Sequence, residues 1–196
     1  MNPFTYWLAK LLVIVIGRIF FRVKVRGREN IPQEGPVIIM SNHISLLDPP
    51  LLGAFLPRKI HYMAKKELFD NKLAGWLLGS LGAFPVKRGT GDRAALRNAL
   101  KILKNEGVLG VFPEGTRYPE GELGEPHTGS IMIALMGQAP IVPAGIKNVK
   151  TGGRTTINFG EPIYLNDFYE EKPDKETQKE IAEQVMAEIE ELLQMD

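Results

Sequence analysis

Three short apolar runs, VIIM at 37–40, VLGVF at 108–112 and IVPAGI at 141–146, constrain the fold of this 196-residue chain more than any other feature. Runs of this length are typical of strands that a sheet buries on both faces. Segments with helical spacing lie between and after them, notably 90–107 and 174–194. Because strands alternate with helices in a chain of single-domain length, we predict an α/β fold with a single domain and a mixed central sheet flanked by helices.

Further elements complete this alternation. In the helix predicted over 90–107, the expected N-cap is Thr90 or Asp92. Its inward face is expected to carry Leu96, Leu100 and Leu103, and the acidic final helix is expected to pack through Ile181, Val185, Ile189 and Leu192 or Leu193. Other strand patterns occur at 21–27, 59–68 and 155–165, the last as a pair of strands, and short apolar helices are predicted at 71–82 and 128–138.

The charges are unevenly distributed along the chain. Residues 1–104 hold 17 Lys and Arg against 6 Asp and Glu, while the rest holds 7 against 17. The basic half therefore favours anionic partners such as phosphates and an anionic membrane surface. Cysteine is absent, which excludes disulfides, thiolate metal sites and cysteine nucleophiles and fits a reducing compartment.

The N-terminal segment FTYWLAKLLVIVIGRIFF is apolar and carries only basic charges. A secretion signal does not fit, because MNPFTYW places no charge ahead of the apolar run. A spanning helix needs about 20 mostly apolar residues, whereas Lys10 and Arg18 bracket only seven. We predict that residues 1–19 form an amphipathic helix at the membrane surface, its aromatic residues at the interface and its cations at anionic lipids. A buried amphipathic helix and a true span are the alternatives.

The stretch SNHISLLDPP after the first apolar run holds His43 and Asp48. A strand-to-helix loop can fold the carboxylate back onto the imidazole, although this spacing separates the two on a regular helix. An Asp bonded to one ring nitrogen fixes the tautomer, so the other nitrogen can accept a proton from a hydroxyl. Since no GxSxG elbow exists, that hydroxyl would belong to the substrate. Asn42 is expected to orient the loop.

The same residues have plainer interpretations. An Asp before a proline is commonly a helix cap, with Pro49 beginning the helix. A lone histidine after a strand is commonly structural. A metal site is disfavoured because the three histidines form no HxH or HExxH pair, and we predict neither metal nor cofactor.

Two further stretches hold groups suited to phosphates and hydroxyls. FPEGTR at 112–117 combines a carboxylate, a glycine, a hydroxyl and a guanidinium on one turn. GAFPVKRG at 82–89 places two cations between glycines. Both also fit ordinary surface turns.

In this order, NHISLLD, GAFPVKR, FPEGTR and IVPAGI resemble the four sequence blocks of the glycerolipid acyltransferase family, in particular its bacterial 1-acyl-sn-glycerol-3-phosphate acyltransferases. The resemblance implies that residues 20–196 form an acyltransferase domain. It implies transfer of a fatty acyl group from a thioester donor, acyl-coenzyme A or acyl carrier protein, to the 2-hydroxyl of lysophosphatidate. No nucleic acid partner is expected, and the implied location is the cytoplasmic face of the cell membrane, as a peripheral or monotopic protein.

By matching position, the resemblance makes His43 the general base and Asp48 its orienting partner. Arg88, beside Lys87, would meet the phosphate of the acceptor. The remaining assignments concern the glycerol and acyl portions: Glu114, Gly115 and Thr116 would hold the glycerol, Arg117 would add positive charge, and the block around Pro143 would line the acyl or acceptor pocket.

One position departs from the family pattern. After FPEGTR the family usually has Lys or Arg two residues before a glycine, whereas PHTGS places His127 there. We expect His127 to lie near the site and to make the grip on the anionic group weaker or pH-dependent. The blocks do not name the acceptor, so glycerol 3-phosphate or another lysophospholipid is an alternative. A non-catalytic module that binds lipid phosphates at the membrane is another.

Overall fold

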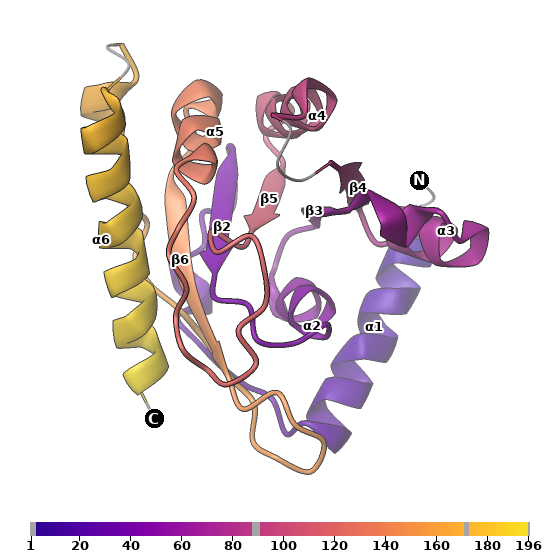
Figure 1. The fold of residues 1–196 in the computed structure, drawn as a ribbon. Helices are drawn as coiled ribbons and strands as arrows, with labels where there is room; N and C mark the ends of the chain where they lie inside the picture. The colour runs from indigo at the N-terminus through magenta and orange to yellow at the C-terminus, as the bar shows by residue number, and fades with distance from the viewer. Residues whose placement is uncertain (1–2, 88–90, 171–172, 196) are drawn as a thin grey trace.

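The apolar runs become the central strands of one sheet (Figure 1). The computed structural model describes residues 3–87, 91–170 and 173–195, without the side chains of residues 3, 4 and 77. Within these residues seven strands pair in the order β1-β7-β6-β2-β5-β3-β4. They are β1 (Lys24–Arg26), β2 (Val37–Ser41), β3 (Ile60–Lys65), β4 (Ala83–Val86), β5 (Val108–Val111), β6 (Ile141–Lys147) and β7 (Thr156–Phe159).

The helices connect and cover these strands. They are α1 (Pro3–Phe20), α2 (Asp48–Phe55), α3 (Lys72–Ser80), α4 (Arg93–Lys104), α5 (Gly129–Gly137) and α6 (Lys175–Gln194), with short 3-10 turns η1 (Arg28–Asn30), η2 (Lys66–Phe69) and η3 (Asn166–Phe168). The β6–β7 pair is antiparallel and all other pairs are parallel. The predicted single α/β domain with a mixed sheet is therefore confirmed.

Two hydrophobic cores lie on opposite faces of the sheet because side chains along each strand alternate in direction. Val37 and Ile39 of β2 join the core under α1 and α2, whereas Ile38 and Met40 join the core under α4, α5 and α6. Figure 1 shows this division, with α1 and α6 at opposite sides of the molecule. Since β2 and β5 are parallel neighbours, the loops that follow them leave the sheet at the same edge.

The structure confirms some of the local predictions and corrects others. Asp92 caps α4 as predicted, accepting from the N–H groups of Ala94 and Ala95, and Thr90 lies outside the described residues. Only Leu103 of the three predicted leucines is fully buried; the inward face of α4 is completed by Ala95 and Ala99. Residues 155–165 form one strand rather than two, since beyond β7 only an isolated bridge from Ile163 to Ile141 pairs with the sheet. The predicted inward stripe of α6, with Leu192, is buried.

Residues 3–20 form helix α1, and both of its cations bond backbone carbonyls of the protein, with Lys10 buried and Arg18 exposed. Lys10 Nζ donates to the carbonyl of Leu56 at 2.6 Å, and Arg18 Nη1 donates to Val23 O at 2.7 Å. Each ammonium or guanidinium thereby satisfies a backbone acceptor that the fold leaves open. The outward face consists of large apolar side chains, all at least 38% exposed: Trp7, Leu8, Leu11, Leu12, Val15, Ile16, Ile19 and Phe20. No helix among the described residues is both long and apolar enough to cross a membrane.

Gly110 in β5 lies directly beneath the ring of Tyr62 on the neighbouring strand. A Cβ at Gly110 would stand 2.2 Å from a carbon of that ring. We expect Gly110→Ala to lower the free energy of unfolding by about 1–3 kcal/mol, because an overpacked core must displace the aromatic ring. Urea unfolding measures this change. Gly129→Ala, where a Cβ meets nothing within 4 Å, is the control; equal stabilities for the two variants would contradict the packing argument.

Candidate active site

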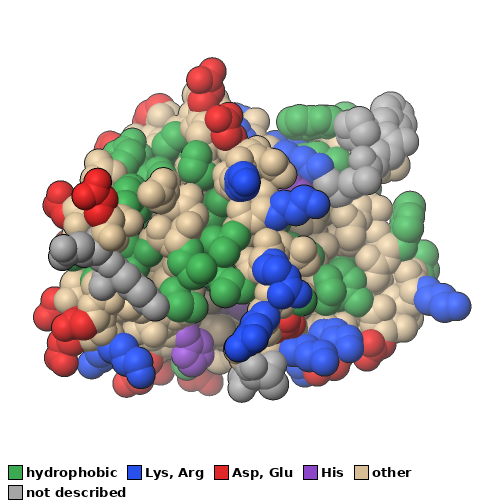
Figure 2. Space-filling view, turned by 90° about the horizontal axis from the view of Figure 1, so that it is seen from above, with side chains coloured by type: hydrophobic (Ala, Val, Ile, Leu, Met, Phe, Trp, Pro, Cys, Tyr) green, Lys and Arg blue, Asp and Glu red, His purple; other side chains and the backbone are tan. Residues whose placement is uncertain are grey.

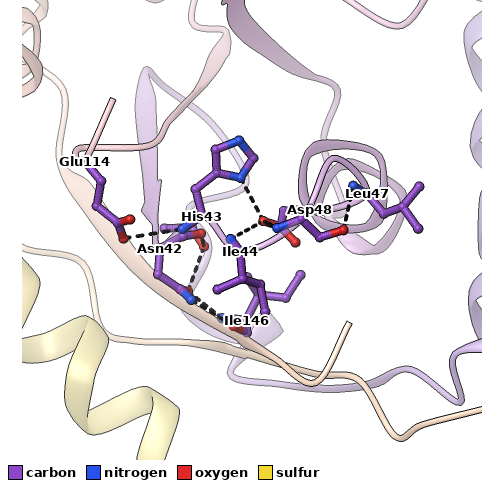
Figure 3. Close-up of polar contacts among 9 residues, drawn as sticks. Asn42, His43, Ile44, Leu47, Asp48, Glu114 and Ile146 are labelled. Carbon is purple, nitrogen blue, oxygen red and sulfur yellow. Dashed lines mark hydrogen bonds and ion pairs between the residues drawn. The ribbon is translucent and has the colours of Figure 1, made fainter. Parts of the chain in front are cut away.

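His43, in the loop after β2, faces Asp48, the first residue of α2 (Figure 3). Nδ1 of His43 lies 2.8 Å from Oδ2 of Asp48, with the two residues 8% and 0% exposed. The same oxygen accepts from the N–H groups of Ile44 and Ser45, each at 2.7 Å. A carboxylate accepts hydrogen bonds, so Nδ1 is the donor in this contact, and Nε2 is not engaged by Asp48. The arrangement therefore orients the imidazole and leaves Nε2 as the nitrogen available for proton transfer.

Asp48 is not the helix cap that its position before Pro49 suggests. Helix α2 begins at Asp48 itself, and the cap position is taken by Leu47, which offers no side-chain hydrogen bond. The carboxylate instead turns back toward the loop, where it bonds Ile44 and Ser45. The loop N–H groups thus fix the carboxylate, and the carboxylate fixes the ring.

Aromatic rings define the plane of the imidazole. The ring of Phe112 stacks on His43 with centroids 4.1 Å apart, and Tyr62 stacks beyond Phe112 at 6.1 Å. Phe112 follows β5, whose end lies beside the end of β2. Neither aromatic residue is among the site residues that the sequence predicts, although Phe112 opens the FPEGTR stretch.

The FPEGTR turn packs against the histidine loop. Backbone N–H of His43 donates to Oε1 of Glu114 at 3.4 Å, and N–H of Tyr118 donates to the carbonyl of His43 at 2.7 Å. Gly115 has a positive φ of 66°, and a Cβ there would stand 2.8 Å from the ring of His127. The backbone N–H of His127 also donates to the carbonyl of Pro113 at 2.9 Å. His127 is therefore beside the turn, as expected from its place in the sequence.

Glu114 is 3% exposed, and Oε2 has no hydrogen-bond partner among the described residues. Burial, with a smaller contribution from the negative charge of Asp48, raises the pKa of this carboxyl from 4.5 to about 7, against the lowering effect of the His43 N–H. Burying a carboxylate in a site with few donors favours its neutral form. Near neutral pH, both protonation states of Glu114 are populated beside the histidine loop.

This raised pKa predicts a pH-dependent stability. A carboxyl whose pKa is higher in the folded state stabilises the fold below its unfolded value, and this contribution is lost as pH rises through the folded value. Relative to Glu114→Gln, the wild type is expected to lose about 1–3 kcal/mol of unfolding free energy as pH rises from 4.5 to above 7. Urea unfolding at several pH values measures both proteins. Parallel stability curves would contradict the assignment.

Asn42 ties the start of the loop to the neighbouring strand. Its side-chain amide donates to the carbonyl of Ile146 and accepts from the N–H of the same residue, both at 2.9 Å. The amide thus continues the β2–β6 ladder by one more pair after the backbone has left the sheet. This anchors the peptide that immediately precedes His43.

An apolar cavity of about 490 Å³ opens beside His43 between α1, α2, β3 and α3. This volume lies in the range of ligand pockets. Thr116 and Arg117 of the FPEGTR turn line it together with His43. Tyr6 and Lys10 of α1 also contribute to its wall, and the remaining lining is largely apolar, from residues such as Leu46, Leu78 and Leu81. No pattern in the sequence places α1 beside the histidine, because that contact depends on the packing of α1 against α2.

The other predicted site residues do not line this cavity or lie outside the described residues. Lys87 is exposed at the end of β4, where its backbone N–H donates to Asp92 at 3.0 Å. Arg88 lies outside the described residues. Pro143 does not line the cavity: it is buried within β6 on the face toward α6, where a Cβ at Gly160 would stand 2.9 Å from its ring. Side chains alternate along β6, and Val142 and Ala144 join the core under α1 and α2. Pro143, which lies between them, therefore points to the opposite face of the sheet.

The described residues contain no group of three or more His, Asp or Glu side chains placed to hold a metal ion. The chemistry available at this site is therefore that of an oriented imidazole, a buried carboxyl, a hydroxyl and a guanidinium beside an apolar cavity. This set suits proton transfer from a hydroxyl on a molecule that has both an apolar and an anionic part.

Known proteins are similar to this one over most of the chain. The acyltransferase family model matches residues 22–147. A 1-acyl-sn-glycerol-3-phosphate acyltransferase of Bacillus subtilis is 37% identical over 177 residues, covering 87% of each chain, and one of Streptococcus pneumoniae is 29% identical over 198 residues, covering 96% of this chain and 73% of the relative. The crystal structure of the 1-acyl-sn-glycerophosphate acyltransferase PlsC from Thermotoga maritima is similar with a TM-score of 0.67 and 26% identity, covering 98% and 99% of the two chains. The chain therefore belongs to the acyltransferase family, and it resembles the family's bacterial 1-acyl-sn-glycerol-3-phosphate acyltransferases.

Proposed function

We propose that this acyltransferase moves a fatty acyl group from a thioester donor to the 2-hydroxyl of 1-acyl-sn-glycerol 3-phosphate, giving phosphatidate. The observation that carries the proposal is the 2.8 Å contact between His43 Nδ1 and Asp48 at the wall of an apolar cavity of about 490 Å³. The names of the similar enzymes support the acceptor. The geometry supports a hydroxyl nucleophile, because Asp48 engages Nδ1 of the imidazole and leaves Nε2 for proton transfer.

In the proposed reaction, Nε2 of His43 takes the proton of the acceptor hydroxyl as its oxygen attacks the thioester carbonyl carbon. A C–O bond forms, the C–S bond breaks, and the imidazolium returns the proton to the departing thiolate. Asp48 stays ionised, holding the ring in one tautomer and stabilising its charged form. No metal or redox group is needed in any step.

The cavity is proposed to hold the acyl chain, because most of its lining residues are apolar. The acceptor's phosphate is assigned to Arg117 at the cavity wall, with Lys87 and Arg88 as the further cations that the sequence predicts for it. Thr116 is exposed and suited to a glycerol hydroxyl. Glu114 is too buried to be an open ligand, so we assign it to support of the His43 backbone. The proposed thioester donor is acyl-coenzyme A or acyl carrier protein.

Helix α1 is proposed to hold the enzyme on the membrane from which the acceptor comes. Its exposed side chains are apolar except for Arg18, while Lys10 is buried against Leu56. A helix with this distribution buries its outer face in the acyl boundary of a bilayer. We propose the cytoplasmic face of the cell membrane as its location, with residues 1–19 as the attachment segment. Because Lys10 and Tyr6 also line the cavity, the same helix links membrane and site.

The test is acyl release from labelled acyl-coenzyme A and, in parallel, from acyl carrier protein. Lysophosphatidate, glycerol 3-phosphate and lysophosphatidylcholine compete as acceptors. Formation of phosphatidate in clear preference to the other products is the expected result. If glycerol 3-phosphate or lysophosphatidylcholine is acylated preferentially, that compound is the acceptor instead of lysophosphatidate. If the protein binds vesicles but transfers no acyl group, its function is lipid binding rather than catalysis.

His127 gives a separate prediction about the grip on the acceptor. An imidazole is mostly charged only at acidic pH, whereas a lysine keeps its charge through neutral pH. We expect His127→Lys to lower the Michaelis constant for lysophosphatidate and to remove much of its rise between pH 6 and 8. Steady-state kinetics across this range, with Thr128→Lys as a control for added charge, measure the effect. A Michaelis constant with the same value and pH profile in His127→Lys would overturn this role.

A further inference from the structure

The outer face of α4 is an uninterrupted basic ridge made by Arg93, Arg97, Lys101 and Lys104. Their spacing places all four on one side of the helix, opposite the buried Ala99 and Leu103, and each of the four is exposed. No acidic residue occurs between Arg93 and Lys104. None of the four makes an ion pair with another residue that the structure describes. Figure 2 shows Lys and Arg side chains as a band across this end of the molecule.

Stabilisation of the helix by its own charges does not explain the ridge. Cations stabilise the last turn of a helix, which covers Lys101 and Lys104, but Arg93 stands in the first turn where the helix dipole disfavours it. Like charges four residues apart, as in Arg93 and Arg97, destabilise an isolated helix. By contrast, the surface of α6 mixes both signs and contains an ion pair between Lys179 and Glu183 at 3.3 Å. A helix that keeps an unpaired, single-sign face is suited to an anionic partner.

The surroundings of the ridge favour a large partner. The ridge spans about 16 Å from its first to its last cation, from the rise of an α-helix. Helix α5 packs beside α4 and exposes Met136, an adaptable apolar contact. A shallow groove of about 380 Å³, lined in part by Asn98, Lys101 and Asn105, borders the other side. A basic ridge with an apolar neighbour matches the acidic, partly apolar face of a protein better than a single phosphate.

A membrane does not fit this face. Helix α4 covers the core opposite the one that α1 and α2 cover, so a bilayer in contact with the outer face of α1 cannot also contact the ridge. The acidic side chains of α6 flank the same face on its far side (Figure 2). They would repel an acidic partner from α6 and direct it toward α4.

The ridge is also connected to the active site. Helix α4 begins after β4, which runs parallel to β3 and thus in the same direction as β2 and β5. Its capping residue Asp92 bonds the backbone of Lys87 at the end of β4. The start of α4 therefore lies at the sheet edge where the His43 loop and the FPEGTR turn emerge. A protein docked along the first half of α4 stands beside that edge.

We propose that the α4 ridge docks the acidic surface of a protein acyl donor, acyl carrier protein, and so directs its thioester toward His43. This rests on the proposed function, because an acyl donor is required only by acyl transfer. Coenzyme A offers phosphates but no protein surface long enough to cover the ridge. We therefore assign the full length of the ridge to the carrier-bound donor.

The test compares the two donors with the same acyl chain in the full-length protein and in Arg97→Glu/Lys101→Glu. The control is Lys24→Glu/Arg26→Glu, which makes the same change in charge at exposed positions of β1, at the other end of the strand order. We expect the ridge variant to raise the Michaelis constant for acyl carrier protein about tenfold or more, with a weaker salt dependence. The constant for acyl-coenzyme A is expected to change less than about twofold, as in the control. Carrier-protein binding is measured separately by fluorescence anisotropy.

Each other outcome overturns the proposal in an identifiable way. An equal loss with both donors, or in the control, shows that the ridge is not a specific docking surface. If the wild type uses only acyl-coenzyme A and does not bind the carrier protein, the docking proposal is wrong and the proposed function stands. Reduced vesicle binding in the ridge variant assigns the surface to lipid instead. Absence of transfer from either donor refutes the proposed function, and the anisotropy comparison then decides the docking surface independently.

Discussion

Substitution of His43 by alanine is expected to lower kcat by ~10²- to 10⁴-fold, the usual cost of losing a general base. The His43 side chain lines the cavity, and Nδ1 of its ring is held by Asp48 at 2.8 Å. Asp48→Asn should lower the rate in the same direction, because an amide can donate to Nδ1 and stabilise the wrong tautomer. Single-turnover acyl transfer to lysophosphatidate measures the chemical step for each variant.

The matched control is His61→Ala. His61 lies in β3, and its Nδ1 contacts the carbonyl of Gly82 at 3.1 Å, away from the cavity that His43 borders. We expect this variant to retain activity within about threefold, since surface or half-buried changes rarely affect a remote site. Thermal unfolding of both variants separates a catalytic effect from loss of the fold. A folded His43→Ala protein with near-normal turnover would end the general-base assignment.

Charging the outer face of α1, by Leu12→Glu together with Ile19→Glu, is expected to reduce partition onto vesicles roughly 100-fold or more. Each large apolar side chain that a membrane buries contributes about 1.5–3 kcal/mol, and 1.4 kcal/mol corresponds to a tenfold change in affinity. Both residues are more than half exposed, so the fold should tolerate the change. Vesicle sedimentation measures the partition. Binding that survives both substitutions would overturn the proposal for α1.

Gln184→Glu together with Ala187→Glu on α6 is the matched control, because it adds the same charge at exposed positions of another helix. This variant should bind vesicles like the wild type. Substitution is a cleaner test than deletion of residues 1–19. A deletion would also remove Tyr6, whose hydroxyl accepts from the N–H of Ile60, and Lys10, which bonds Leu56.

Much of the architecture was predictable from local pattern. The apolar runs at 37–40 and 108–112 are strands, and the stripe through Ile181, Val185 and Ile189 is buried, because burial must repeat with the period of each element. The capping role of Asp92 was predictable for the same kind of reason, since the cap bond forms within three residues. The histidine and carboxylate of the SNHISLLDPP loop could be singled out by their chemistry alone.

What the tertiary structure decided concerns directions and neighbours across long sequence separations. Whether Asp48 caps α2 or supports His43, and whether Lys10 meets lipid or Leu56, depends on which backbone groups are left unpaired in the folded chain. Pro143 faces α6 rather than the cavity because the register of β6 beside β2 decides which of its alternating side chains point to each face of the sheet. Local sequence determines the period and type of an element because those follow from backbone geometry within a few residues. Packing alone determines the direction in which each face points, and so brings Phe112, Tyr62 and α1 to His43.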